Sequence, residues 1–365
     1  MDATRLAAAC AKIDEYAAVG APMSGAKIAA ICAIIEDGAT ARKHRRKKRR
    51  RRLCVDSTRS YKQIGEVGIG NFGAVVLARH RKTGQAVAIK TFRGRDGKKS
   101  PDVGEVLREA CFLAASAGHP NLVGLHTVAR RPGTKEYFVV MEFVGPSLRH
   151  ALNKHLRIHD APFPEADVRR IMRHILTGAQ AMHSLCIVHR DIKPVNILVK
   201  EDGRVVKICD YGLAMYTAKS GPPYRVGTGA YMAPEVLMCR SDYDERVDLW
   251  SIGCVMAELL SGKVLFKVEN GVRQIDKIFD LLGAPAEETF ETFMSPFMCG
   301  KVLRRRARLP PPRRDSRLRE LLPSDVLSED GYGVLKGLLT CNPKERLTAA
   351  TTLQLPWFIG TAGVP

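Results

Sequence analysis

The chain contains the stretch His189-Arg190-Asp191-Ile192-Lys193-Pro194-Val195-Asn196, and Asp210-Tyr211-Gly212 follows it fourteen residues later. Asp191 can orient a hydroxyl nucleophile and accept its proton, and Lys193 can offset the charge of a migrating phosphoryl group. Asn196 and Asp210 carry the hard oxygen atoms that Mg²⁺ prefers. Any one of these residues alone is more often a turn former. The four at this spacing, flanked by apolar runs at 186–188 and 197–199, indicate phosphoryl transfer from ATP.

A glycine-rich segment lies upstream and reads Val67-Gly68-Ile69-Gly70-Asn71-Phe72-Gly73-Ala74-Val75. Glycine tolerates a tight hairpin, and the missing side chains let backbone N–H groups approach a triphosphate. Alone the motif is weak, because glycine-rich hairpins are common. Together with the downstream motifs it predicts a phosphate cradle between two strands.

A lysine ends the apolar run Val87-Ala88-Ile89-Lys90. Most lysines are solvated surface charges, but one that follows a glycine loop can reach the α- and β-phosphates if an acidic residue fixes its direction. The candidate is Glu109, in a helix expected over 102–114, with Glu105 one turn earlier as the alternative. Glu109 is preferred because Leu113, one turn later, shares its face and should pack inward.

From 61 to 358 the chain resembles a eukaryotic serine/threonine protein kinase of the cyclin-dependent kinase and MAP kinase group. The motifs above carry this resemblance, together with Ala233-Pro234-Glu235 and Asp248-Leu249-Trp250-Ser251-Ile252-Gly253. It implies a two-lobed α+β fold with a small, mainly antiparallel β N-lobe around one key helix (61–141), a hinge (142–144) and a larger helical C-lobe (145–358). Helical periodicity over 166–184 and 248–260 agrees with this division.

The resemblance also implies the site residues. The catalytic set comprises Asp191, Lys193, Asn196, Lys90, Glu109 and Thr228, whose hydroxyl should bond Asp191 or Lys193. The ATP-binding set comprises the glycine-rich segment from Val67 to Val75, Ala88, Lys90, the gatekeeper Met141, the hinge residues Glu142, Phe143 and Val144, and also Leu198 and Asp210. Asn196 and Asp210 would hold Mg²⁺, and Glu235 would pair with Arg346.

Several positions depart from the resembled group. Met232 stands where the group has an arginine that shapes the pocket for a proline after the phosphoacceptor, so proline direction is not implied. Met215 replaces an arginine that clamps an activating phosphothreonine, which leaves Arg108 and Arg190 of that cluster. We therefore expect activity without a phosphate on the usual threonine, or control through Thr217, Ser220 or Tyr224.

Two further departures concern partners and packing. Residues 103–107 do not reproduce the helix with which the group contacts cyclins, so a regulatory subunit of cyclin type remains open. Tyr211 replaces the usual phenylalanine after Asp210, and its hydroxyl must find a partner if it is buried.

The region before the kinase-like segment has two parts. Residues 1–41 are alanine-rich, and two similar stretches at 6–13 and 28–35 suggest either a small helical hairpin that docks on the kinase or a partner, or a loosely ordered extension. Residues 42–60 form a basic linker, and ten of the eleven residues from Arg42 to Arg52 are Lys or Arg. This run supplies half of the net charge of +20. It is interpreted as a nuclear-import signal, a tail for nucleic acid or an acidic partner, or a solvated linker.

The amino-acid composition indicates the cellular compartment in which the protein is expected. Ten cysteines without a CxxC pair favour free thiols in a reducing compartment. No run of 18 apolar residues occurs, so a membrane span is not expected. We expect a nuclear protein because of the basic run, and otherwise a cytoplasmic one. A second basic cluster, over 304–317, is interpreted as a surface loop or a recruiting site for an acidic partner, and 359–365 form a short tail.

Two functional classes remain. The first is an active kinase that uses ATP and Mg²⁺ on protein Ser/Thr hydroxyls, with a role in cell-cycle or transcription regulation implied by the resemblance. The second is a catalytically silent kinase-fold scaffold tethered through the basic run. Activity is favoured because Lys90, Asp191, Asn196 and Asp210 are all present.

Overall fold

The computed structural model describes residues 2–18, 31, 55–70, 73–94, 102–200, 202–217, 225–267, 271–284, 300 and 316–360. The chain divides into two compact units, Met1–Gly145 with Cys209–Gly212, and Pro146–Ile208 with Leu213–Pro365. Several sequence-based predictions fall on residues outside the described ranges, namely the basic runs at 42–52 and 304–315, and Asn71, Phe72, Ser220 and Tyr224.

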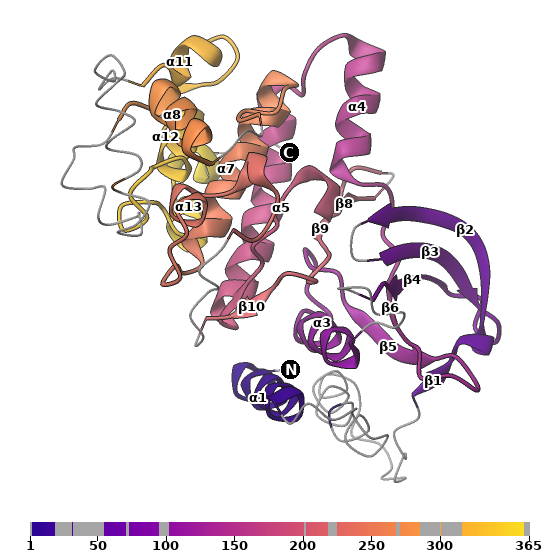
Figure 1. Ribbon diagram of the computed structural model, residues 1–365. Helices are drawn as coiled ribbons and strands as arrows, with labels where there is room; N and C mark the ends of the chain where they lie inside the picture. Colours follow the sequence, from indigo (N-terminus) through magenta and orange to yellow (C-terminus); the bar gives the residue numbers. More distant parts are fainter. Residues whose placement is uncertain are drawn as a thin grey trace. The chain divides into compact units, whose positions relative to one another are not determined.

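A six-stranded sheet forms the body of the first unit, with strand order β1-β5-β6-β4-β3-β2 (Figure 1). All its neighbours pair antiparallel except β1 with β5, which are parallel. The α+β prediction with a mainly antiparallel N-lobe is therefore confirmed. The strands are β1 (Asp56–Ser57), β2 (Tyr61–Gly70), β3 (Gly73–His80), β4 (Ala86–Phe92), β5 (Leu125–Arg130) and β6 (Tyr137–Glu142), with a 3₁₀ turn over Thr58–Ser60.

Alternation along the strands gives the sheet two different faces. Val87 and Ile89 of β4 join Phe138 and Val140 of β6 in an apolar cluster on one face. Lys90, the next residue after Ile89, therefore points to the opposite face. Helix α3 (Val103–Ala115) packs against β5 and β6, and the Asp102 side chain caps its start by accepting a hydrogen bond from the Gly104 amide.

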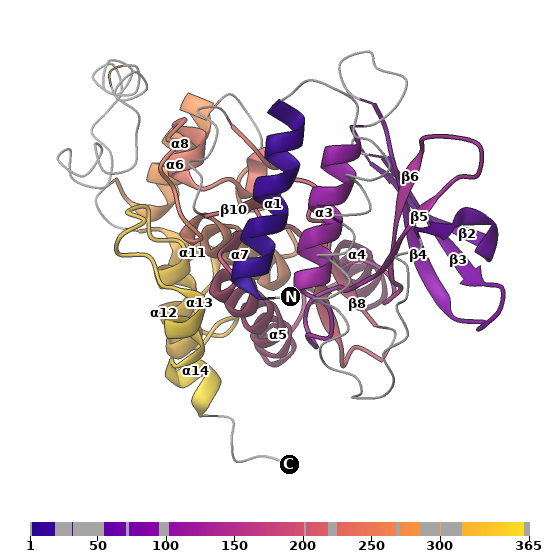
Figure 2. The ribbon, with the colours of Figure 1, turned by 90° about the horizontal axis from the view of Figure 1, so that it is seen from below.

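The N-terminal helix α1 (Ala3–Ala18) belongs to the same unit and lies beside α3 in both views (Figures 1 and 2). Its buried side chains are Leu6, Ala9, Cys10 and Ile13, which form one stripe at helical spacing. The first of the two similar alanine-rich stretches is thus helical. Of the second stretch only Ile31 lies within the described residues.

The second unit is mainly helical and is built around α7 (Arg246–Ser261), which is buried from Val247 to Leu260. The longest helix, α5 (Glu165–Ser184), packs against α7, and both match the stretches where helical periodicity was seen. The other helices are α4 (Leu148–His159), α6 (Pro234–Leu237), α8 (Gly271–Leu282), α11 (Leu318–Leu321), α12 (Glu329–Leu338), α13 (Ala349–Leu353) and α14 (Pro356–Ile359).

Two short strand pairs carry the functional loops of the second unit. Strand β7 (Ile187–Val188) pairs with β10 (Met215–Tyr216), and β8 (Ile197–Val199) pairs with β9 (Val206–Ile208). Short 3₁₀ turns cover Pro194–Asn196 and Gly229–Tyr231. The stretch from Arg190 to Lys193 is therefore held between two strand pairs. None of the described helices has the length and apolar character needed to span a lipid bilayer.

Candidate active site

Lys90 is the centre of a buried charge cluster in the first unit. Its Nζ lies 2.7 and 2.8 Å from the two carboxylate oxygens of Glu109 and 2.6 Å from Oδ1 of Asp210. Lys90 and Glu109 are both buried, whereas the Asp210 side chain is about one-third exposed. The structure thus confirms the preference for Glu109 over Glu105 as the partner of this lysine.

The cluster holds one positive and two negative groups, and this imbalance affects its ionisation. Burial, aided by the charge of Asp210, outweighs the attraction of Lys90 and raises the pKa of Glu109 to about 7. Burial alone would lower the pKa of Lys90, but the two carboxylates outweigh it and raise that pKa. Lys90 therefore stays charged near neutral pH, and Glu109 is the group that titrates.

The glycine-rich segment forms the hairpin of β2 and β3. Gly73 has φ of +148°, and a Cβ there would lie 1.7 Å from the Thr91 carbonyl oxygen, so packing demands glycine. At Gly68 and Gly70, by contrast, a Cβ would meet nothing within 4 Å. Packing does not require glycine at these two positions, which leaves their backbone open to an anionic ligand.

The residues predicted around adenine occupy adjacent strands of the same sheet. Val75 pairs with Lys90, and Ala88 pairs with both Leu77 and Met141. Ala88 and Met141 are buried, and Glu142 ends β6 just before Phe143 and Val144. Leu198 belongs to the second unit, in β8.

The catalytic-loop candidates of the second unit converge on Asp191. The Asp191 carboxylate is contacted by Lys193 Nζ at 2.8 Å and by Asn196 Nδ2 at 3.0 Å. Asn196 Nδ2 also donates to the Asp191 backbone carbonyl at 2.9 Å. Because the amide nitrogen of Asn196 makes both bonds, its side-chain oxygen is available as a hard oxygen ligand.

Thr228 completes this group from the segment that precedes Ala233-Pro234-Glu235. Its hydroxyl donates to Asp191 Oδ1 and accepts from Lys193 Nζ, each at 2.7 Å. The prediction that Thr228 bonds Asp191 or Lys193 is confirmed for both. The neighbouring Gly227 has φ of +107°, and a Cβ there would meet the Arg190 carbonyl oxygen at 2.3 Å, so this segment packs tightly on the loop.

Asp248 of α7 anchors the backbone of the catalytic loop at His189 and Arg190. Its carboxylate accepts hydrogen bonds from the amides of His189 and Arg190, both at 2.8 Å, and from the His183 ring at 3.0 Å. Burial opposes ionisation of this fully buried group, but the His183 and His189 contacts outweigh it and lower the pKa of Asp248. Its charge is thus part of the folded loop.

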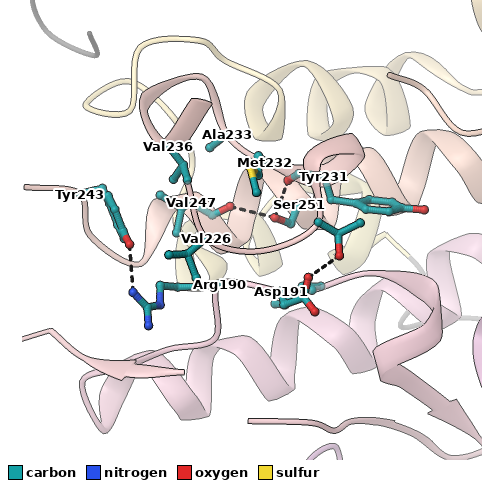
Figure 3. A pocket seen from close by; sticks show the side chains of 12 residues that line it. Arg190, Asp191, Val226, Tyr231, Met232, Ala233, Val236, Tyr243, Val247 and Ser251 are labelled. Atoms are coloured by element: carbon teal, nitrogen blue, oxygen red, sulfur yellow. Dashed lines mark hydrogen bonds between the residues drawn. The ribbon is translucent and has the colours of Figure 1, made fainter. Parts of the chain in front are cut away.

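A small pocket adjoins Asp191, and Figure 3 shows the side chains that line it. They come from the 190–192 loop, the segment around the 3₁₀ turn Gly229–Tyr231, α6 and α7. Met232 contributes to this lining, in place of an arginine, and Ser251 donates to the Tyr231 carbonyl at its edge. The apolar lining residues are Ile192, Val226, Met232, Ala233, Val236 and Val247.

The two arginines left from the phosphate-binding cluster have other partners here. Arg190 donates to the Leu213 carbonyl at 2.7 Å and to the Tyr243 hydroxyl at 3.1 Å (Figure 3). Arg108 forms an ion pair with Asp14 of α1 at 2.9 Å. Sequence reasoning missed Tyr243 and Asp14, because nothing in their neighbourhoods marks them as partners of distant arginines.

Two other sequence predictions about packing are confirmed. Glu235 and Arg346 form a buried bidentate pair at 2.7 and 3.0 Å. The buried hydroxyl of Tyr211 finds a partner in Ser116 at 2.7 Å.

Comparison with known proteins agrees with this geometry. The protein kinase domain family matches residues 61–358. The chain belongs to this family. Among its relatives, putative cyclin-dependent kinase F-2 of Oryza sativa subsp. japonica is 43% identical over 305 residues, which cover 82% of this chain and 89% of the relative.

More distant relatives carry related names. Cell division control protein 2 homolog 3 of Trypanosoma brucei brucei is 36% identical, over 82% of this chain and 91% of its own. Cyclin-dependent kinase G1 of Arabidopsis thaliana is 33% identical, over 83% of this chain but only 49% of the relative. This kinase is thus a serine/threonine protein kinase similar to cyclin-dependent kinases.

Proposed function

We propose that this kinase transfers the γ-phosphoryl group of ATP to protein Ser/Thr hydroxyls, with Asp191 as the residue that receives the substrate proton. The observation that carries this role is the convergence of Lys193, Asn196 and Thr228 on one buried carboxylate. A carboxylate fixed by three neighbours can present an oxygen to a hydroxyl in one orientation. Lys193 would offset charge on the transferring phosphoryl group.

In the first unit, Lys90 is proposed to bind the α- and β-phosphates. Glu109 holds its ammonium group in place through both carboxylate oxygens. The open backbone at Gly68 and Gly70 would contact the phosphates from the β2–β3 hairpin. Ala88 and the 141–144 segment would receive adenine, as the family resemblance implies.

Mg²⁺ fits the donor set. Within the described residues no group of three or more His, Cys, Asp or Glu side chains is arranged to hold a metal. As the family resemblance implies, Asn196 Oδ1 and the Asp210 carboxylate would be the protein ligands of Mg²⁺, and two such oxygen atoms suit Mg²⁺ because this ion keeps waters and binds substrate phosphates. When bound, the ion neutralises phosphate charge.

A transfer assay with matched variants tests the proposed function. Purified kinase is incubated with labelled ATP, Mg²⁺ and a generic basic protein, and Asp191→Asn is compared with Asp325→Asn, an exposed aspartate outside the site. We expect Asp191→Asn to lose at least about 10²-fold in kcat and Asp325→Asn to match the parent. Equal labelling by all three would remove the catalytic assignment and favour the silent scaffold.

The basic run at 42–52 is proposed to direct the kinase to the nucleus and to bind acidic partners or nucleic acid. Ten positive charges in eleven residues support both roles. A fluorescent fusion in which these residues are replaced by Gly and Ser tests import. A nucleic-acid mobility shift that weakens with salt and disappears in the same variant tests binding.

The names of the relatives suggest a cyclin-type regulatory subunit and a role in cell division, and the family resemblance also implies a role in transcription control. These are proposals for this kinase. Co-purification of a cyclin with the tagged full chain, and the activity of the chain before and after that cyclin is removed, would test the first.

A further inference from the structure

Helix α3 is covered on a second side, in addition to the side that packs on the sheet. Of its thirteen residues nine are buried, including an unbroken run from Glu109 to Ala114. A helix that packs on one surface buries only a stripe, so burial on this scale needs another covering element. In the first unit that element is α1, which lies along α3 in both ribbon views (Figures 1 and 2).

The contact between the two helices is both apolar and charged. Leu6, Ala9 and Ile13 of α1 are completely buried. At the same interface Asp14 accepts a hydrogen bond from Arg108 Nη2 at 2.9 Å. This ion pair is about one-third exposed on each side, so it adds registry to a contact whose stability comes from the apolar stripe.

Arg108 is the immediate neighbour of Glu109 in α3. The α1 contact therefore acts on the helical turn that carries the carboxylate paired with Lys90. A second restraint comes from the C-cap residue Ser116, which bonds Tyr211 beside Asp210. The helix is held near its middle and at its end by residues of its own chain.

We infer that α1 is a built-in positioning element for α3, which holds Glu109 against Lys90 from within the same chain. The inference rests on the proposed role of Lys90 and Glu109 in ATP binding. A second chain that bound the same face of α3 would have to displace α1.

The test compares adjacent positions of α1 in the full chain. Asp14→Arg places two positive charges at the interface, whereas Glu15→Arg changes an exposed carboxylate next to it. Ile13→Asp puts a charge into the apolar stripe, and Lys12→Asp puts the same residue on the exposed face. We expect Asp14→Arg and Ile13→Asp to lower kcat/KM for ATP about tenfold, and the two controls to match the parent.

Charge exchange separates positioning from general stability. The double variant Asp14→Arg with Arg108→Asp reverses the ion pair and should recover most of the lost kcat/KM, while the melting temperature differs little among the parent and these charge variants of the partly exposed pair. Unchanged kcat/KM in Asp14→Arg and Ile13→Asp would overturn the inference. So would a loss matched by a fall in melting temperature that the exchanged pair does not recover.

Hydrogen exchange gives a readout that does not depend on catalysis. Amides of α3 should exchange faster in Ile13→Asp than in Lys12→Asp, even if the parent transferred no phosphate. Identical exchange in the two variants would show that α1 does not restrain α3. A parent that is inactive but shows the difference in exchange would instead contradict the proposed function alone.

Discussion

The hydroxyl oxygens of Tyr211 and Ser116 lie 2.7 Å apart in the interior of the first unit. The Ser116 hydroxyl also lies 2.9 Å from the Phe112 carbonyl oxygen, so it contacts both groups. Burial raises the pKa of Tyr211, which keeps this hydroxyl protonated at all physiological pH values. The tyrosine that follows Asp210 is thus bonded to the end of α3.

Removal of the Tyr211 hydroxyl and removal of the Ser116 hydroxyl should lower the free energy of unfolding by different amounts. Tyr211→Phe removes one hydroxyl of the pair and should cost about 1 kcal/mol of unfolding free energy, because Ser116 keeps its bond to Phe112. Ser116→Ala removes the bonds to both Tyr211 and the Phe112 carbonyl and should cost about 1–3 kcal/mol. Urea unfolding measures both. The double variant should be no less stable than Ser116→Ala, and a clearly lower stability would contradict this account.

The pKa of Glu109, raised to about 7, predicts an acidic limb in the activity profile. As pH falls below 7 the carboxylate takes up a proton and its ion pair with Lys90 is lost, so kcat/KM for ATP should fall by up to about tenfold per pH unit. Initial rates between pH 5.5 and 8.5 measure this. Glu105→Gln should leave the limb in place, and a flat profile would refute the assignment.

Stability should respond to pH in the opposite sense at this residue. The pKa of Glu109 is raised on folding from 4.5 to about 7, so folding favours its protonated form. Its contribution to stability is complete below pH 4.5 and is lost as pH rises through 7. Between pH 8 and 6, kcat/KM should therefore decline although Glu109 itself does not lower the melting temperature.

The Thr228 hydroxyl joins Asp191 to Lys193, and its loss should slow transfer. Thr228→Val removes two hydrogen bonds to charged groups and should lower kcat about 10- to 100-fold, whereas Thr228→Ser should keep most activity. A phosphate there would meet the Asp191 carboxylate, so full activity should not require one. Mass spectrometry of an active preparation checks this, and the expectation fails if activity tracks phosphate on Thr228.

Met232 makes the pocket beside Asp191 more apolar than an arginine would. We expect peptides with leucine or methionine after the phosphoacceptor to be phosphorylated at least as well as those with proline. Met232→Arg should shift the preference toward proline, as the family resemblance implies. A peptide array that varies this one position measures both, and a strong proline preference in the parent would show that Met232 does not set it.

The buried pair of Glu235 and Arg346 should be costly to break. Arg346→Met leaves the Glu235 carboxylate buried without its cation and should reduce the free energy of unfolding by about 3–5 kcal/mol. Denaturant unfolding measures the change. Lys344→Met, at an exposed position nearby, serves as the control and should change little.

The local patterns predicted much of the site, because hydrophobic period and motif spacing act over a few residues. The choice of Glu109 over Glu105 followed from the inward face of its helix, and α5 began one residue before the expected stretch. Contacts between distant segments could not be predicted in the same way. Asp14 and Arg108 are 94 positions apart, and an alanine-rich helix does not show which surface it will contact.

The carboxylate of Asp248 accepts hydrogen bonds from two successive amides of the catalytic loop. It therefore fixes the reacting residues independently of the residues that recognise a substrate. It comes from a helix buried along almost its whole length. Met232, which lines the pocket beside Asp191, lies on a separate segment, so a different side chain at 232 need not move this anchor. Specificity can therefore diverge between related enzymes while the reacting geometry is inherited intact.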